Sequence, residues 1–189
     1  APYSINLVQG LVNAGVQLDS TVLAAYESWC TASVNDPDPG FWGHWPRYYA
    51  EMPVKQDWVQ AAAKRCQTAV VVIGRSAGED RENTLKKGSF YLTNKEKALL
   101  DAVTAAFQKV VLVLNIGSIM DFAEIDAYGD KISAILLAWQ LGMESGNAVA
   151  DVLTGKVNPS GRLTDTIAKT YADYPAQNFG NKAENRYTE

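Results

Sequence analysis

The sequence is poor in the residues that most metal sites and many nucleophilic sites need. It has one histidine, His44, and two cysteines, Cys30 and Cys66, among 189 residues. A single histidine excludes a multi-histidine metal site, and the cysteines have neither C-x-x-C nor metal-ligand spacing. We therefore expect no metal and no cofactor. The cysteines are interpreted as thiols without a role, with a disulfide as the alternative.

The chain also has no excess of positive charge and no long apolar run. The formal net charge is -4, and no cluster of lysine and arginine occurs along the chain. Nucleic acid is therefore not an expected partner, since the chain has no surplus of basic residues to neutralise its phosphates. No apolar run approaches the roughly 20 residues that span a bilayer, and the N-terminal residues APYSINL lack a signal-peptide pattern. We expect no membrane partner.

What the sequence does contain is a regular alternation of apolar strands and helices. Continuous apolar runs at residues 68–74, 110–115 and 131–139 predict strands. Helical spacing predicts helices at 4–14, 20–31, from 57 onward, 94–108 and 144–154. Such an order is typical of an α/β fold, a mostly parallel sheet with helices on both faces, as in a flavodoxin-like α/β sandwich. With 47% hydrophobic residues, a single domain over 1–189 is expected.

Local motifs refine these boundaries. Thr93 and Glu96 predict a capping box at the start of the helix at 94–108, and Gly155 predicts the end of the helix at 144–154. The turn NPSG precedes a predicted short strand at 163–167. Residues 34–53, rich in Pro, Gly and aromatics, predict a long loop insertion.

The segment VVVIGRSAGEDREN, residues 70–83, invites three interpretations from its residues alone. Its G-x-S-x-G pattern would make Ser76 a nucleophile, but no helix follows directly, and His44 precedes the serine, unlike the histidine of α/β-hydrolases. A phosphate-binding loop is the second interpretation, but Glu79 and Asp80 would repel a phosphate, and the loop matches no nucleotide-binding motif. A solvated cluster of charges around a turn is the interpretation that composition favours.

Four stretches together resemble the C-terminal α/β sandwich domain of glycoside hydrolase family 3, the family of β-glucosidases and related exo-acting enzymes. They are VVVIGRSAGEDREN with GSFYLT, then VLVLNIG, AILLAWQLGMESGNAVADVLTGKVNPSGRLTDT and NFGNKAENRYTE. The third is highly specific. The resemblance covers about residues 3–189 and is weakest over 36–53.

The resemblance implies that the chain is a piece of a larger protein. The nucleophile of this family is an aspartate on a separate TIM-like barrel domain, which cannot fit in 189 residues. The implied partners are that barrel domain and a β-glucoside or oligosaccharide substrate. The implied function is retaining, exo-acting hydrolysis of terminal non-reducing β-linked sugars by barrel and sandwich together.

The resemblance also assigns roles to residues. The family's acid/base lies in a pattern resembling Ser-Gly-Glu-Gly-x-Asp-Arg, which places it on Glu79. Because the loop is shorter here, Glu82 is a competitor. Asp80, Arg81, Phe90 and Tyr91 are predicted to contact substrate, whereas Glu144 is predicted to have a structural or interface role. Two roles are open for the aromatic residues of the predicted insertion: packing the insertion onto its own domain, or stacking on a sugar ring at an outer subsite. These residues are Phe41, Trp42, Trp45, Tyr48 and Tyr49.

A rival from another class stays open on the sequence alone. A non-catalytic α/β module that binds a nucleotide or a protein partner would need the same alternating strands and helices.

Overall fold

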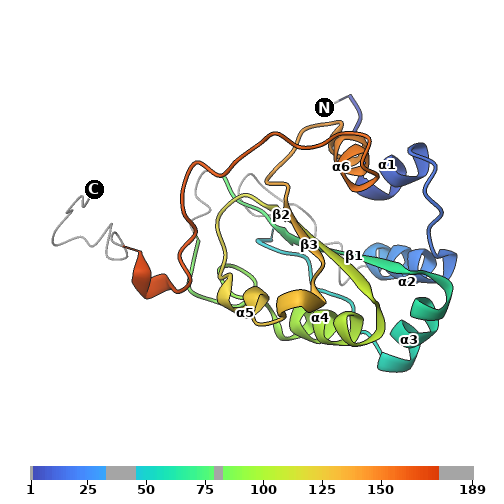
Figure 1. Cartoon of the computed structure of the whole chain (residues 1–189), viewed down its shortest axis with the longest axis horizontal. Coiled ribbons are helices and arrows are strands. Elements are labelled where there is room, and N and C mark those ends of the chain that lie inside the picture. The colour runs from blue at the N-terminus through green and yellow to red at the C-terminus, as the bar shows by residue number, and fades with distance from the viewer. Residues whose placement is uncertain (1, 33–45, 79–82, 175–189) are drawn as a thin grey trace.

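The protein is described by a computed structural model that covers residues 2–32, 46–78 and 83–174 (Figure 1). Its centre is a three-stranded parallel sheet in the order β1-β2-β3. The strands are β1 (Thr68–Arg75), β2 (Lys109–Ile116) and β3 (Ala134–Leu137). The expected α/β fold with a parallel sheet is confirmed.

Helices connect and flank the strands. They are α1 (Leu7–Asn13), α2 (Ser20–Thr31), α3 (Gln56–Arg65), α4 (Asn94–Ala106), α5 (Ala123–Asp126) and α6 (Ser145–Leu153), with the 3-10 turns η1 (Gly129–Lys131) and η2 (Tyr171–Asp173). The predicted capping box at α4 is confirmed, since the Thr93 hydroxyl accepts from the Glu96 N–H and the Glu96 carboxylate accepts from the Thr93 N–H.

The main core lies between the sheet and α4, α3 and α5. Alternate residues of β1, such as Val71 and Ile73, point into it together with most of the apolar side chains of β2. Its fully buried members include Ile73, Leu92, Leu100, Leu112, Leu114, Ile116, Met120 and Ile125. The core thus fixes the ends of β1 and β2, from which the predicted site residues follow.

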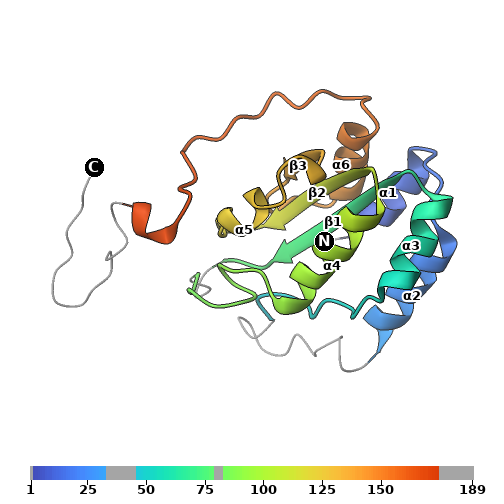
Figure 2. The same cartoon turned by 60° about the horizontal axis from the view of Figure 1, so that its bottom comes forward.

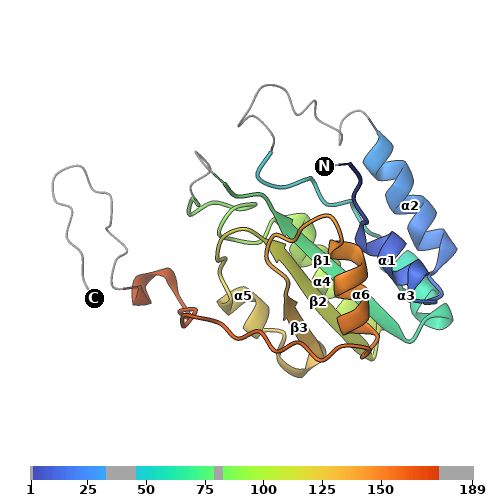
Figure 3. The same cartoon turned by 90° about the horizontal axis from the view of Figure 1, so that it is seen from above.

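Helix α6, which packs against α1, lies on the opposite face of the sheet (Figure 3), where Val70 and Val72 of β1 remain 38% and 41% exposed. The two helices pack closely because Gly10 of α1 faces the backbone of α6, and Gly146 of α6 faces the backbone at the start of α1. A Cβ on Gly10 would overlap the Gly146 carbonyl, and a Cβ on Gly146 would overlap the Asn6 carbonyl. The Gly146 N–H also donates to the Ile5 carbonyl at 2.9 Å. Val113 of β2, which is 2% exposed, and Ala150 of α6 are buried on this face of the sheet.

The Gly146→Ala substitution is therefore expected to destabilise this domain by about 1–3 kcal/mol, because the backbones of α1 and α6 must separate. Urea denaturation would measure the change. Gly142→Ala is the matched control, since an added Cβ there meets no atom within 4 Å. Equal stability of the two variants would contradict this description of the α1–α6 contact.

The structure differs from the sequence expectations in two strands. The third strand is confined to Ala134–Leu137 because Lys131 belongs to η1 and Trp139 has a φ of 58°, which no extended strand adopts. Residues 163–167 form no strand, and Leu163 is 52% exposed. A strand needs a neighbouring edge to pair with, and these residues pair with no strand among those that the structure describes. Of the predicted insertion, residues 46–53 form neither helix nor strand, and 34–45 lie outside the described residues.

Candidate active site

Three loops meet at the carboxyl ends of the strands, the edge where open α/β sheets bind ligands (Figure 2). The loop after β1 is joined to the loop after β2, because the Asn83 amide donates to the Ile119 carbonyl at 2.6 Å and the Asp121 N–H donates to the Phe90 carbonyl at 2.8 Å. It is joined to the segment after β3 by Gln140, whose amide donates to the Ala77 carbonyl at 3.2 Å.

The predicted acid/base Glu79 lies outside the described residues, as do Asp80, Arg81 and the competitor Glu82. The residues on either side of them are described. Gly78 ends the outgoing segment and Asn83 begins the returning one. The roles assigned to these four residues therefore stay predictions, and the described part of the site consists of the loop residues on either side of them.

Ser76 serves as a structural tie in this loop. Its N–H donates to the Arg47 carbonyl at 2.7 Å, and its hydroxyl donates to the Pro46 carbonyl. Both contacts go to backbone, so the serine joins the end of β1 to residues 46–47. His44, the one histidine that could act as its base, lies outside the described residues.

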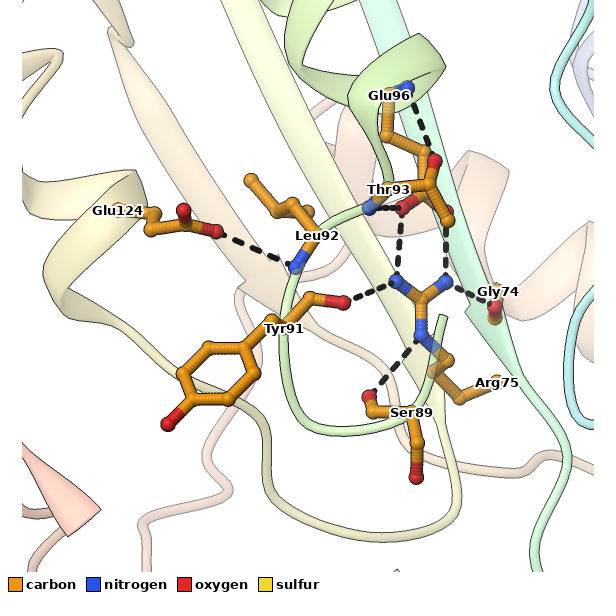
Figure 4. Close-up of polar contacts among 8 residues, drawn as sticks. All are labelled: Gly74, Arg75, Ser89, Tyr91, Leu92, Thr93, Glu96 and Glu124. Atoms are coloured by element: carbon orange, nitrogen blue, oxygen red, sulfur yellow. Dashed lines mark hydrogen bonds and ion pairs between the residues drawn. The ribbon is translucent and has the colours of Figure 1, made fainter. Parts of the chain in front are cut away.

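Arg75, the last residue of β1, lies at the centre of a buried polar network (Figure 4). Its guanidinium binds both carboxylate oxygens of Glu96, at 2.6 and 2.8 Å. The remaining donors reach the carbonyls of Gly74, Ser89 and Tyr91, at 2.7, 3.2 and 3.5 Å. Both charged side chains are almost completely buried. Arg75 therefore has no donor left over for a substrate, and its charge is matched within the fold.

Glu96 has a second role as the capping residue of α4. One of its oxygens accepts from the Thr93 N–H at 2.7 Å while also binding Arg75. A nearby carboxylate, Glu124, accepts from the Leu92 N–H at 3.3 Å (Figure 4). It also accepts from the Lys97 ammonium group at 2.9 Å. Side chains thus hold the returning part of the loop along its whole approach to α4.

Phe90 and Tyr91, both predicted to contact substrate, differ in accessibility. The Phe90 ring is 4% exposed and packs edge-on against Tyr91 and against Tyr171, with ring centres 5.1 and 5.8 Å away. Tyr91 is half-buried, and its ring points away from the Arg75 network (Figure 4). Substrate contact stays a prediction for both, and Tyr91 is the more accessible of the two.

Of the aromatic stretch, Tyr48 and Tyr49 are described, and Phe41, Trp42 and Trp45 are not. The Tyr48 ring packs on Gly88, where a Cβ would overlap it, and lies 5.6 Å from the Arg75 guanidinium. Tyr49 is 61% exposed. Tyr48 thus packs against the loop of its own domain, whereas Tyr49 is free to meet another molecule or domain.

Glu144 has hydrogen-bond partners that fit a structural role. Its carboxylate accepts from the Tyr3 hydroxyl at 2.7 Å and from the Asn147 amide at 2.6 Å. These hydrogen bonds, that of Tyr3 foremost, hold the pKa of the Glu144 carboxyl below its ordinary value. A general acid needs the opposite shift.

Sequence reasoning missed several residues that shape this edge. Asn83 and Gln140 tie loops together, and Trp139, 40% exposed, has a left-handed backbone that is rare for a bulky residue. No local pattern marks these contacts, since Gln140 and its partner Ala77 are 63 residues apart. Glu96 was recognised as a cap, but its pairing with Arg75 was not.

Nothing in the described residues indicates a metal or a membrane span. They contain no group of three or more His, Cys, Asp or Glu side chains that could hold a metal ion. In the same residues, no helix combines the length and apolar character that crossing a bilayer requires. Cys30 and Cys66 are both free thiols.

The chain is similar in sequence to bacterial β-glucosidases. A beta-glucosidase of Ruminococcus albus is 41% identical over 184 residues, which is 97% of this chain and 19% of that protein. Beta-glucosidase A of Butyrivibrio fibrisolvens is 37% identical over 69% of this chain and 18% of its own length. This chain therefore spans about a fifth of the length of these relatives.

Solved structures show the same correspondence. A β-glucosidase from Paenibacillus barengoltzii matches 93% of this chain with a TM-score of 0.86 and 37% identity, and the match covers 19% of that protein. Beta-glucosidase 3B from Thermotoga neapolitana, in complex with glucose, matches 94% with a TM-score of 0.81 and 32% identity. The family model described as "Glycosyl hydrolase family 3 C-terminal domain" matches residues 1–189. The chain therefore belongs to the glycosyl hydrolase family 3 C-terminal domain family.

Proposed function

We propose that this chain is the acid/base-bearing domain of a retaining, exo-acting β-glycosidase that is β-glucosidase-like. It would hydrolyse terminal non-reducing β-linked sugars together with a TIM-like barrel domain of the same protein. The observation that carries the proposal is that Ala77 and Gly78, which precede Glu79 in the stretch that matches the family's acid/base motif, follow the carboxyl end of β1 where three loops meet. The names of the relatives described above, which are β-glucosidases, support the substrate class.

The proposed mechanism needs two carboxylates. One, on the barrel, attacks the anomeric carbon and forms a glycosyl-enzyme. Glu79 first protonates the leaving oxygen and then deprotonates the water that releases the sugar. Such pairs stand about 5 to 5.5 Å apart, so Glu79 must reach across to the partner domain. A loop at the sheet edge is a suitable carrier for that contact.

Glu79 must also be protonated before it can act as an acid. Burial beside the substrate and the negative charge of the nucleophile would both raise its pKa. A free arginine next to it would lower that pKa. Arg75 is occupied by Glu96 and by backbone carbonyls, so its charge is already compensated, as the proposal requires. The same is proposed for Arg81.

The pure 189-residue chain is expected to hydrolyse no glycoside, because it supplies an acid/base without a nucleophile. The measurement is release of phenol from an aryl β-glucoside by the chain alone and by the complete protein that joins it to the barrel domain, called the complete enzyme below. Turnover by the chain alone that Glu79→Gln abolishes would overturn the proposal. Absence of turnover by the complete enzyme would overturn it as well.

A further inference from the structure

The buried Arg75–Glu96 pair ties together three parts of the chain around the β1 loop. Arg75 ends β1, Glu96 lies in the first turn of α4, and the carbonyls of Ser89 and Tyr91 belong to the returning part of the loop. One guanidinium therefore connects the residue from which the loop departs to the residues through which it returns (Figure 4).

Stability alone does not account for such a pair. Burying two charges costs desolvation energy, and apolar replacements of similar volume are often as stable as a buried ion pair. An apolar pair could not hold the carbonyls of Gly74, Ser89 and Tyr91, however, whereas the planar fork of an arginine can. What the pair adds is a fixed geometry for the loop.

A second set of contacts fixes the point to which the chain returns. The Ser89 hydroxyl donates to the Asn83 side chain at 2.6 Å and accepts from the Thr84 N–H at 2.9 Å. The Asn83 amide in turn binds the Ile119 carbonyl at 2.6 Å. Since Arg75 holds the Ser89 carbonyl, the ion pair and the Asn83 contacts form one connected network.

From this network we infer that Arg75 and Glu96 are positioning residues for the acid/base step. They fix the positions of Gly78 and Asn83, the loop residues on either side of the segment that contains Glu79. The inference rests on the proposed function, and neither residue touches substrate. It assigns to a buried ion pair, which the reaction itself does not use, the task of holding the proton donor within hydrogen-bond reach of the leaving oxygen. Displacing a catalytic group by about 1 Å can cost on the order of 100-fold in rate.

The test compares leaving groups in the complete enzyme. A 2,4-dinitrophenyl β-glucoside needs no proton to expel its stable anion, whereas a phenyl β-glucoside does. For Arg75→Lys, which keeps the charge but not the fork, kcat/KM for the phenyl glucoside is expected to fall about 10- to 100-fold. For the dinitrophenyl glucoside it is expected to change less than about threefold, because general-acid help contributes little there.

Two further variants separate positioning from folding. Ser89→Ala leaves the ion pair intact and removes the Asn83 and Thr84 contacts, so it should show the same leaving-group dependence in milder form. Leu99→Ala, in the core face of α4, should lower thermal stability and leave the ratio of the two kcat/KM values unchanged. Equal losses on both substrates for Arg75→Lys and Ser89→Ala would overturn the inference.

Failure of the inference can be told from failure of the proposed function by Glu79→Ala on the same two substrates. If Glu79→Ala shows the leaving-group dependence and the Arg75 and Ser89 variants do not, the positioning role is wrong and Glu79 remains the acid/base. If Glu79→Ala itself shows no such dependence, the proposed function is wrong and the inference falls with it.

Discussion

Replacing Glu79 with alanine in the complete enzyme is expected to lower kcat/KM for a phenyl β-glucoside by about 10²- to 10⁴-fold, the range that general acid catalysis contributes. The loss for a 2,4-dinitrophenyl β-glucoside should be far smaller, since its departure needs no proton. Azide, a nucleophile that needs no general base, should speed breakdown of the glycosyl-enzyme and yield a β-glucosyl azide. The measurement is steady-state hydrolysis with and without azide, together with identification of the sugar product.

Glu82 supplies the matched control for this prediction. It lies in the same short acidic run, and the shortened loop makes it the competitor for the role. Glu82→Ala should therefore leave both kcat/KM values close to those of the unchanged enzyme. If Glu82→Ala shows the leaving-group dependence and the azide rescue instead, the register of the loop is shifted and the acid/base assignment moves to Glu82.

Replacing Glu96 with alanine is expected to destabilise this domain by about 3–5 kcal/mol, because it leaves the buried Arg75 charge without its partner. The loss of the α4 capping box adds to the effect. Urea denaturation followed by circular dichroism would measure it. Glu96→Gln keeps an oxygen that can accept from the Thr93 N–H. It should therefore restore only the part of the lost stability that comes from the capping box.

An exposed glutamate provides the comparison for Glu96. Glu27 lies on the exposed side of α2, and its replacement by alanine should lower the free energy of unfolding by less than about 0.5 kcal/mol. If Glu96→Ala were as mild as Glu27→Ala, the Arg75 guanidinium would have to find water or another acceptor, and the buried pair would not order the loop as described.

The parts of the fold that local patterns encode could be predicted from the sequence. Strands β1 and β2 follow from continuous apolar runs rich in β-branched residues, which are typical of strands in a parallel sheet flanked by helices. Helix α2 has the predicted bounds, 20–31, and the capping box of α4 is the predicted Thr93–Glu96 pair. In each case the determinants lie within a few residues of one another.

The contacts that shape the candidate site are not local, and so they were not predicted. Arg75 and Glu96 are 21 residues apart, and Asn83 and Ile119 are 36 apart. Gly10 and Gly146 approach because two helices from opposite ends of the chain pack on one face of the sheet. The strand expected at 163–167 failed for a similar reason, since an apolar run alone does not say whether a neighbouring edge exists. The acid/base assignment came from the family resemblance and not from the residues alone, which favoured a solvated turn.

The measurement that tests the central claim most directly is a crystal structure of the complete enzyme with a 2-deoxy-2-fluoroglucosyl group trapped on its nucleophile. The predicted result is a Glu79 carboxyl group about 5 to 5.5 Å from the nucleophilic carboxylate, on the side from which the leaving group departs. A Glu79 carboxyl more than about 6.5 Å away, with another carboxylic acid in that place, would contradict the account.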